Sequence, residues 1–599
     1  MLRELLDKQV AKLSMEDICR LRGGVEALHS ACDGRLRVGT ACAGTDLFIG
    51  CLESVVALWE ELFGISFGIS HCFSCENVDF KQDFILDHWN PELFFPDLMK
   101  LHLDSTEDIR GRSCGVPPVD VFVCGIECDS ISALSCNASK NRTCIELEAG
   151  RTGSTAAACM RYVRKHRPAV WIAENVKSLA TKGPDGKSNL SQLITLANEV
   201  GYLVRAQVME TQRYGLPQSR SRYYLVGVLV SPGPVNQLRE KFEWPGWVHG
   251  FDALLRQVQV PPVPFERVVL PNGHELVELA HAARPLASDS RRKPKAKATA
   301  SGQRAAASAQ SQPAAAFGQS QPAAASGHSQ EAPASGQSQQ ESKVAVPQYH
   351  VDHLEKYMGV GLAWPPEAHW TPEFEAKTQC LSNRMREILW YVEHQQGPAR
   401  SLKSLSFRDL NMTIGWSYDW DAICPCIVST STLWVRGTMP ATVSDQRAAT
   451  VSDQCAATVS DQRTALCDTA SGQAVQCVDH VLTGEEALAL QGFDYTLQSR
   501  APDLHKWSQK EKIDLAGNAF SASSVLPLLV ALATWAPLPA AFEARVSDQG
   551  EVTAYGQQDS MDGVALSQAS DGAEEGGEEE TQSQPDSVHS CESGVSVAD

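Results

Sequence analysis

A cysteine in the first quarter of the chain stands where a thiol could do chemistry. The run VDVFVCG (Val119–Gly125) is rich in alternating and β-branched apolar residues, which predicts a short buried strand. Cys128 follows three residues after its closing glycine. Open α/β sheets bind ligands beyond the carboxyl ends of their strands, so Cys128 is a candidate reactive thiol. A buried structural cysteine is the commoner explanation for any one of 19 cysteines, and Cys128 stands out only through the residues that accompany it.

Three further polar groups follow Cys128 along the chain. The segment AVWIAENV predicts a strand that ends in Glu174 and Asn175. Two more predicted strands flank the run QSRSR, which carries Arg220 and Arg222. The far end of the chain contributes AGNAF (Ala516–Phe520). The order of a thiol, a carboxyl group and two guanidinium groups, each beside a predicted strand end, makes them one candidate site.

The elements that must position these residues alternate between strand and helix. The first unit begins at Arg37 with a short strand, turns at Gly39 and Gly44, and enters a helix that ends near Phe63. The second predicted strand ends in Glu76, where an acidic side chain can accept hydrogen bonds from ribose hydroxyls; a surface glutamate is the alternative. The alternation predicts an α/β fold class with a doubly wound, mostly parallel sheet and helices on both faces.

The net charge of −20 does not exclude nucleic acid as a partner, because the charge is unevenly spread. From Glu543 onward about fourteen acidic residues stand against one basic residue, Arg545. The rest of the chain is only mildly acidic, which leaves room for a basic groove. No run approaches the length of a transmembrane helix and the amphipathic start differs from a secretory signal, so we expect an intracellular chain with reduced cysteines.

Low-complexity segments interrupt the chain. Residues 283–345 are rich in Ala, Ser, Gln and Gly and are predicted to be disordered. Their basic start, Arg291–Lys297, is either a nuclear localisation signal or a solvated linker. An eight-residue repeat, ATVSDQRA, begins at Ala441 and predicts a surface insertion.

An aromatic-rich region, residues 346–436, lies between these two segments. Its CPC sequence (Cys424–Cys426) has no second cysteine pair at the usual zinc spacing, so core or local packing explains it better than zinc. Beyond the repeat, His480–Phe493 and Asp514–Trp535 are predicted to be helical.

Taken in order, the cysteine, ENV, QSRSR and AGNAF resemble the motifs of the cytosine-5 DNA methyltransferase family, whose members methylate cytosine with S-adenosylmethionine. The resemblance covers residues 35–230 and 346–540. It implies a Rossmann-like methyltransferase sheet with a smaller inserted target-recognition domain. The predicted organisation is an N-terminal helical segment (1–34), a first catalytic part (35–282), a disordered linker (283–345), a target-recognition region (346–436), a repeat insertion (437–475), a return segment that completes the catalytic domain (476–540) and a disordered acidic tail (541–599).

The resemblance implies a role for each catalytic candidate. Cys128 adds to carbon-6 of cytosine, which makes carbon-5 nucleophilic toward a methyl sulfonium. Glu174, its pKa best raised by burial, donates to ring nitrogen-3, and Arg222 supports charge that develops on the cytosine oxygen. Arg220 steadies the Cys128 loop or the DNA backbone. The base must be flipped out of the duplex, and the polar Ser130–Gly153 loop is expected to close on it.

The family pattern also implies a binding site for S-adenosylmethionine, and it implies no metal. The residues expected to bind the cofactor are Thr40, Ala41, Gly44 and Thr45 at the methionine part, Glu76 at the ribose, Asp97 at the adenine amine, and Asn518, which returns from the far end of the chain. The return explains why a motif of the first domain stands so late in the sequence.

Some residues depart from the family pattern. Glu127 and Asp129 flank Cys128, where the family usually has proline or a small residue before the nucleophile and often glutamine after it. Adjacent carboxylates are expected to raise the thiol pKa and weaken catalysis, unless they turn to solvent or meet basic partners. The glycine turn lacks the usual phenylalanine–glycine phrase, and His480 stands where an arginine is common.

The favoured hypothesis is an active DNA (cytosine-5)-methyltransferase that acts on duplex DNA in the nucleus. The acidic tail then either binds chromatin partners or keeps the protein soluble. The same chemistry on RNA, as in the tRNA-directed branch, is one alternative, although the large region 346–436 favours DNA. A catalytically silent or weak DNA-binding relative is another. A generic small-molecule methyltransferase leaves QSRSR and Cys128 unexplained.

Overall fold

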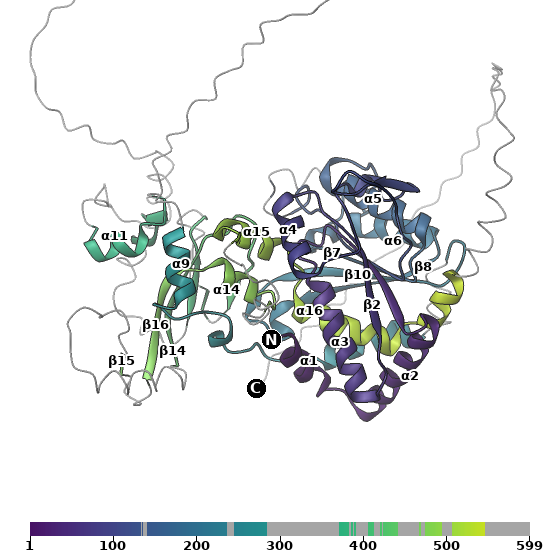
Figure 1. The fold of residues 1–599 in the computed structure, drawn as a ribbon, viewed down its shortest axis with the longest axis horizontal. Helices are drawn as coiled ribbons and strands as arrows, with labels where there is room; N and C mark the ends of the chain where they lie inside the picture. Colours follow the sequence, from purple (N-terminus) through teal and green to yellow (C-terminus); the bar gives the residue numbers. More distant parts are fainter. Residues whose placement is uncertain are drawn as a thin grey trace, which may run out of the picture. The chain divides into compact units, whose positions relative to one another are not determined.

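The structure is a computed structural model of the 599-residue chain (Figure 1). The residues that it describes are 1–132, 135, 141–235, 245–283, 370–382, 385–386, 388–390, 405–411, 420–421, 423–440, 467–468, 474–493 and 506–545. The predicted linker from residue 284, the basic run Arg291–Lys297, the eight-residue repeat and the acidic tail beyond Arg545 lie outside these ranges.

The larger of the two main sheets has seven strands. In order across the sheet they are β3 (Leu93–Phe95), β2 (Gly68–Cys75), β1 (Arg35–Ala41), β6 (Val121–Gly125), β7 (Val170–Val176), β10 (Ser221–Leu229) and β8 (Tyr202–Glu210). All neighbours from β3 to β7 pair in parallel, and β10 is antiparallel to both β7 and β8. The predicted mostly parallel sheet is therefore confirmed. Its strand order reverses between β1 and β6, which is where open α/β sheets bind their ligands.

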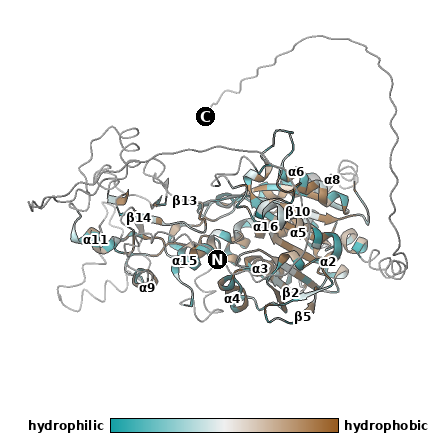
Figure 2. Cartoon of the chain, turned by 90° about the horizontal axis from the view of Figure 1, so that it is seen from above, coloured by the Kyte–Doolittle hydropathy of each residue, from teal (hydrophilic) through white to brown (hydrophobic). Residues whose placement is uncertain are grey.

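Buried apolar runs explain these central strands. In β7 the residues from Val170 to Asn175 are all buried, and four of the five residues of β6 are buried. Parallel strands covered on both faces have such continuous apolar sequences. Figure 2 shows apolar residues gathered in the strands of this sheet.

Helices cover both faces of the sheet. On one face α5 packs against α6, and on the other α16 packs against α1, α2, α3 and α8 (Figure 1). Their bounds, with α4 between β2 and β3, are α1 (Leu2–Val10), α2 (Met15–Ala31), α3 (Leu47–Phe63), α4 (Asp79–His88), α5 (Gly150–His166), α6 (Asn189–Glu199), α8 (Pro245–Gln257) and α16 (Ala522–Trp535).

The predicted single helix Asp514–Trp535 is in fact two. α15 (Gln509–Asn518) ends before Ala519, and α16 begins after Ser521. Among the described residues the stretch Gln509–Trp535 is long and apolar enough to cross a membrane by length and composition, contrary to the sequence expectation, but 89% of its most apolar window is buried in the protein. A helix that is apolar on all sides belongs in a core, and α16 lies there, buried from its first residue through Ala533.

A second sheet has five strands, and its order is β12 (Trp420–Asp421), β11 (Ser406–Asp409), β14 (Leu433–Pro440), β16 (Ala474–Val481) and β15 (Cys467–Asp468). It crosses two predicted boundaries, because β14 and β16 pair with each other across the predicted insertion. The prediction that His480 begins a helix was wrong. His480 lies in β16, and the helix α14 spans only Gly484–Ala489.

Residues near 270, which were predicted to belong to the first domain, also contact this second sheet. Asn272 N donates to Cys477 O at 3.2 Å, and Asn272 Oδ1 accepts from Asp479 N at 2.9 Å. The helix α9 (Glu275–Ala283) follows directly, and its His281 ring lies 6.2 Å from that of His480. The predicted boundary at 282 therefore does not separate the two sheets.

Order also extends past the predicted end of the return segment at 540. Residues 538–545 are helical, and Arg545 is 3% exposed. Its guanidinium pairs with the buried carboxylate of Asp120 at the start of β6. Arg37 N and Nη2 donate to the same carboxylate, each at 2.8 Å. This cluster fastens the last described residues to the amino end of the central strands.

Replacement of Asp120 should therefore destabilise the fold. Asp120→Ala leaves Arg545 buried without its anion and is expected to lower the free energy of unfolding by about 3 kcal/mol. Urea denaturation followed by circular dichroism measures this difference. Asp104→Ala is the matched control, since Asp104 pairs with Lys165 on the surface, where solvent screens the pair, and this substitution should change stability much less. Equal effects of the two substitutions would contradict the prediction.

Candidate active site

Three strand ends meet at the carboxyl edge of the large sheet. Glu174 of β7 stands directly opposite Gly125, the last residue of β6, and Cys128 follows three residues later. β10 runs the other way and so begins at this edge, with Arg222 opposite Val176. The sheet register therefore brings together the candidate thiol, carboxyl group and guanidinium groups that the sequence separates.

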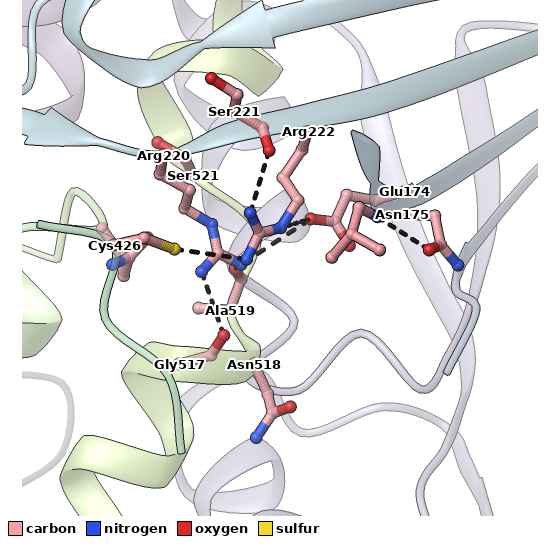
Figure 3. A network of polar contacts seen from close by, with 12 residues as sticks. Glu174, Asn175, Arg220, Ser221, Arg222, Cys426, Gly517, Asn518, Ala519 and Ser521 are labelled. Atoms are coloured by element: carbon pink, nitrogen blue, oxygen red, sulfur yellow. Dashed lines mark hydrogen bonds and ion pairs between the residues drawn. The ribbon is translucent and has the colours of Figure 1, made fainter. Parts of the chain in front are cut away.

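The Arg222 guanidinium has partners on three sides. Its Nε lies 3.1 Å from Glu174 Oε1, its Nη1 donates to Ser221 O at 2.9 Å, and its Nη2 donates to Cys426 Sγ at 3.5 Å (Figure 3). Glu174 is 9% exposed. Its Oε1 atom is buried and, among the described residues, accepts no well-formed hydrogen bond despite these ion-pair contacts. An acceptor held in place but not saturated suits a ligand-binding position.

Arg220 is buried deeper, at 3% exposed. Its Nη1 and Nη2 donate to Gly517 O at 3.1 Å and to Ala519 O at 2.8 Å, and Nη1 also reaches Ile427 O at 3.4 Å (Figure 3). Its closest approach to Glu174 is 3.7 Å. The sequence suggested the Cys128 loop or the DNA backbone as the partner of Arg220. Its hydrogen bonds go instead to the return segment and to Ile427, which follows the strand Cys424–Pro425.

Asn175 joins β7 to the loop that carries Cys128. Its Nδ2 donates to Ile126 O at 2.9 Å, and its Oδ1 accepts from Val176 N at 2.7 Å. The backbone two residues before Cys128 is thereby tied to the strand that carries Glu174. In the ENV motif one residue thus faces the site while its neighbour positions the loop.

The chain turns at Cys128, whose carbonyl accepts from Ile131 N at 3.0 Å. Ser130 N then donates to Thr152 Oγ1 at 3.3 Å, and Ser130 O accepts from Asn141 Nδ2 at 2.8 Å. The helix α5 begins at Gly150, which shortens the predicted Ser130–Gly153 loop. Residues 133–134 and 136–140 of that loop lie outside the described residues.

Burial dominates the ionisation of Cys128. It raises the pKa of the thiol to about 11, the Glu174 carboxylate adds to the rise, and the Arg222 charge opposes it. The expected effect of the flanking carboxylates is smaller. Asp129 contributes after these, and its exposed side chain meets Arg151 at 3.3 Å. Glu127 is half-buried, and burial together with Asp129 raises the pKa of its own carboxyl group.

The turn after β1 is tightly packed. Thr40, Ala41, Gly44 and Thr45 are all buried. The Thr40 hydroxyl donates to Asp46 Oδ2 at 2.8 Å, so it faces the interior rather than a ligand. The same carboxylate contacts Ser74 and lies 3.6 Å from His71, and burial raises the pKa of Asp46 to about 6. These buried contacts hold the turn in place from the protein interior.

The far end of the chain reaches this turn, as expected. Gly44 has a positive φ of 71°, and a Cβ there would lie 2.6 Å from Asn518 O. Only glycine allows that approach. The Asn518 side chain is exposed, and its Nδ2 donates to Asp514 Oδ1 at 2.8 Å, so its backbone rather than its amide meets the turn.

The other two cofactor candidates lie at neighbouring strand ends. Glu76 follows β2, and its Oε1 accepts from Asn77 N at 2.9 Å, while burial raises the pKa of its carboxyl group. Asp97 follows β3, and its Oδ1 accepts from Met99 N at 2.9 Å. Its carboxylate also lies 3.7 Å from Lys100 at the surface. Glu76 is therefore enclosed at the sheet edge, whereas Asp97 caps a short helical turn.

Two parts of the site were missed from the sequence. The first is the strand β13 (Cys424–Pro425), which pairs with β9 (Gln218–Ser219), together with the residues that follow β13. The second is the network around Asp46. The CPC sequence was a usable signal for the first. Within the described residues no group of three or more His, Cys, Asp or Glu side chains could hold a metal ion.

The comparisons with known proteins agree with this geometry. Residues 71–250 match the family model described as C-5 cytosine-specific DNA methylase. Over this stretch the chain resembles a divergent member of that family. The matched residues include Cys128, Glu174, Arg220 and Arg222.

Two curated proteins are similar to this chain. It is 26% identical over 282 residues to the DNA (cytosine-5-)-methyltransferase DMT5 of Cryptococcus neoformans, a match that covers 46% of this chain and 11% of that protein. It is 29% identical over 180 residues to the type II methyltransferase M.NgoFVII of Neisseria gonorrhoeae, covering 30% of this chain and 44% of the other. The alignments thus span a small part of one relative and under half of the other.

Among solved structures, the S. pombe Dnmt2 methyltransferase aligns with 83% of this chain and 98% of its own, at 10% identity and a TM-score of 0.32. That score is too low to add support. The fold assignment rests on the strand order and directions given above.

The Cys128 thiol should change its reactivity with pH in a way that reports on Glu174. Because the thiol has a pKa of about 11, the rate of its alkylation by iodoacetamide is expected to rise with pH up to about that value. Glu174→Gln removes a negative charge beside the thiol, which favours the thiolate and shifts the half-maximal rate to lower pH. Mass spectrometry of the Cys128 peptide measures both rates. Asp129→Asn is the control and should shift the midpoint less, and an upward shift with Glu174→Gln would contradict the assigned electrostatics.

Proposed function

We propose that this protein is an S-adenosylmethionine-dependent DNA (cytosine-5)-methyltransferase that acts through a covalent cysteine adduct. The observation that carries the proposal is the Arg222 guanidinium, which lies 3.1 Å from Glu174 and close enough to Cys128 to lower the pKa of the thiol. A nucleophile, an acid and a cation thus converge on one place. The match to the family model and relatives named for DNA methylation support DNA as the substrate.

In this proposal the Cys128 thiolate adds to carbon-6 of a flipped cytosine, so that a carbon–sulfur bond forms while the double bond between carbon-5 and carbon-6 breaks and its electrons make carbon-5 nucleophilic. Glu174, once protonated, donates a hydrogen bond to ring nitrogen-3. Arg222 stabilises the charge on the cytosine oxygen. S-adenosylmethionine, when bound, supplies the methyl group for carbon-5. Loss of the carbon-5 proton then expels Cys128.

The buried residues near the turn after β1 fit such a cofactor. Gly44 lets the Asn518 backbone close on the turn, and the buried Thr45 Oγ1 has no hydrogen-bond partner in the described part of the chain, so it can bond to a ligand. Glu76 directs a buried carboxylate to the edge of the sheet, where it can accept from ribose hydroxyls. Thr40 and Ala41 support the turn, and Asp97 is the outermost contact.

Covalent trapping tests the proposal directly. The protein is incubated with S-adenosylmethionine and duplex DNA that contains 5-fluorocytosine, in which fluorine blocks the final elimination. We expect a denaturation-resistant adduct with the unmodified protein and none with Cys128→Ser. The same assay with 5-fluorocytosine RNA separates the two nucleic acids, and an adduct on RNA alone would overturn the DNA assignment.

A weak or silent DNA-binding relative is the second candidate, and the raised pKa of Cys128 favours it. The free protein holds little thiolate at neutral pH, so catalysis requires that bound substrate change this balance. Binding of both S-adenosylmethionine and DNA without an adduct would support the silent relative.

A DNA substrate and the basic run Arg291–Lys297 also support a nuclear location, and the acidic tail suits basic chromatin partners.

Cofactor binding provides a separate prediction. Glu76→Ala is expected to weaken S-adenosylmethionine binding at least about tenfold, because a hydrogen bond to a charged group contributes about 1.5–3 kcal/mol. Isothermal titration calorimetry measures the dissociation constant. Glu92→Ala is the matched control, since Glu92 is exposed beside the opposite end of β3 and should bind as the unmodified protein does. Equal affinities of the two variants would remove Glu76 from the cofactor site.

A further inference from the structure

Cys426 was expected to serve core or local packing, but its sulfur lies against the arginines of the site. Arg222 Nη2 donates to Cys426 Sγ at 3.5 Å. Figure 3 shows the guanidinium groups between this sulfur and Glu174. Cys426 is half-buried, whereas Cys424, two residues earlier, is fully buried. The two cysteines of CPC therefore have different surroundings.

The backbone fixes Cys426 in this place. β13, which precedes it, pairs in parallel with β9. Directly after it, Ile427 O accepts from Arg220 Nη1 at 3.4 Å. A Cβ at Gly517 would lie 2.5 Å from Ser429 N, so the end of α15 packs directly on this segment. Both flanks of Cys426 are therefore held in place, and its sulfur lies 3.7 Å from Ile427 O as well as against Arg222.

The local charges favour an anionic sulfur. Arg220 and Arg222 bring two positive charges to the site, and Glu174 supplies one negative charge. Burial acts to raise the pKa of Cys426, but the charges of Arg222 and Arg220 outweigh it, so the pKa falls below its ordinary value. Burial, and after it the charge of Cys426, raises the pKa of the Cys424 thiol, so the neutral form of Cys424 is favoured. A Cys426 thiolate would neutralise the positive charge that Glu174 leaves uncompensated.

We propose that Cys426 is a positioning residue for methyl transfer, whose sulfur anchors the Arg222 guanidinium from the side opposite Glu174. The inference rests on the proposed function. In the proposed reaction Glu174 must turn toward the cytosine ring and be protonated. Its ion pair with Arg222 is then weakened. Ser221 O and the Cys426 sulfur are the partners that remain, and of these two the sulfur can carry a negative charge. Arg222 thus keeps its orientation toward the base while Glu174 changes partners.

The first test needs no catalysis. Thiolate ultraviolet absorbance is followed against pH, and the curve of Cys426→Ser is subtracted from that of the unmodified protein. We expect the difference to titrate below pH 9.0, the ordinary thiol value, and to move upward when Arg222→Met removes the charge. A difference that appears only above that value, unchanged by Arg222→Met, would overturn the proposal. Circular dichroism of each variant confirms that the fold is kept.

The second test separates positioning from structure. Cys426→Ala should lower kcat for DNA methylation about tenfold, with the KM for S-adenosylmethionine unchanged, because one hydrogen bond to a charged group is lost. Cys426→Ser keeps an acceptor and should recover part of that loss. Cys19→Ser, an exposed cysteine on α2, is the control. A kcat of Cys426→Ala equal to that of the control would overturn the proposal, whereas an inactive unmodified protein would refute the proposed function and leave the titration to decide the anchor.

Discussion

One buried guanidinium, that of Arg220, holds together three parts of this protein that are far apart in sequence. Arg220 directly precedes β10, donates to Gly517 O in the last turn of α15 and to Ala519 O just after that helix, and reaches Ile427 O near the second sheet. A buried carbonyl that loses its donor costs about 1–3 kcal/mol. The walls of the site therefore depend on an arginine whose motif first indicated catalysis.

Arg220 and Arg222 show how one short motif can serve two purposes. Side chains two residues apart on an extended chain point to the same side, so both guanidinium groups enter the same interior. The first finds backbone carbonyls and is enclosed by them. The second finds Glu174 and a cysteine sulfur, and it remains beside Cys128. The difference lies in the partners that other segments supply, since the arginines themselves are chemically identical.

In the free protein the charged groups of the site have opposing effects on the pKa of Cys128. Glu174 raises the pKa of Cys128 and Arg222 lowers it, while burial exceeds both effects. In the proposed reaction the flipped cytosine becomes the partner of Glu174, whose carboxyl group is then neutral. Glu174 would therefore no longer raise the pKa of Cys128. Nucleophile activation would thereby be coupled to substrate binding, which suits an enzyme whose thiol should stay inert until a cytosine is in place.

The sequence alone determined the alternation of strands and helices, the mostly parallel sheet and the places of Cys128 and Glu174 at strand ends, because apolar periodicity is a local property of the chain. It did not determine that His480 lies in a strand, that the last core helix is broken before Ser521, or that Cys426 contacts Arg222. Those features arise from strand pairing and ion pairs between residues up to about three hundred positions apart, such as Arg220 and Ala519. Only the tertiary structure decides them, because no short window of sequence contains both partners.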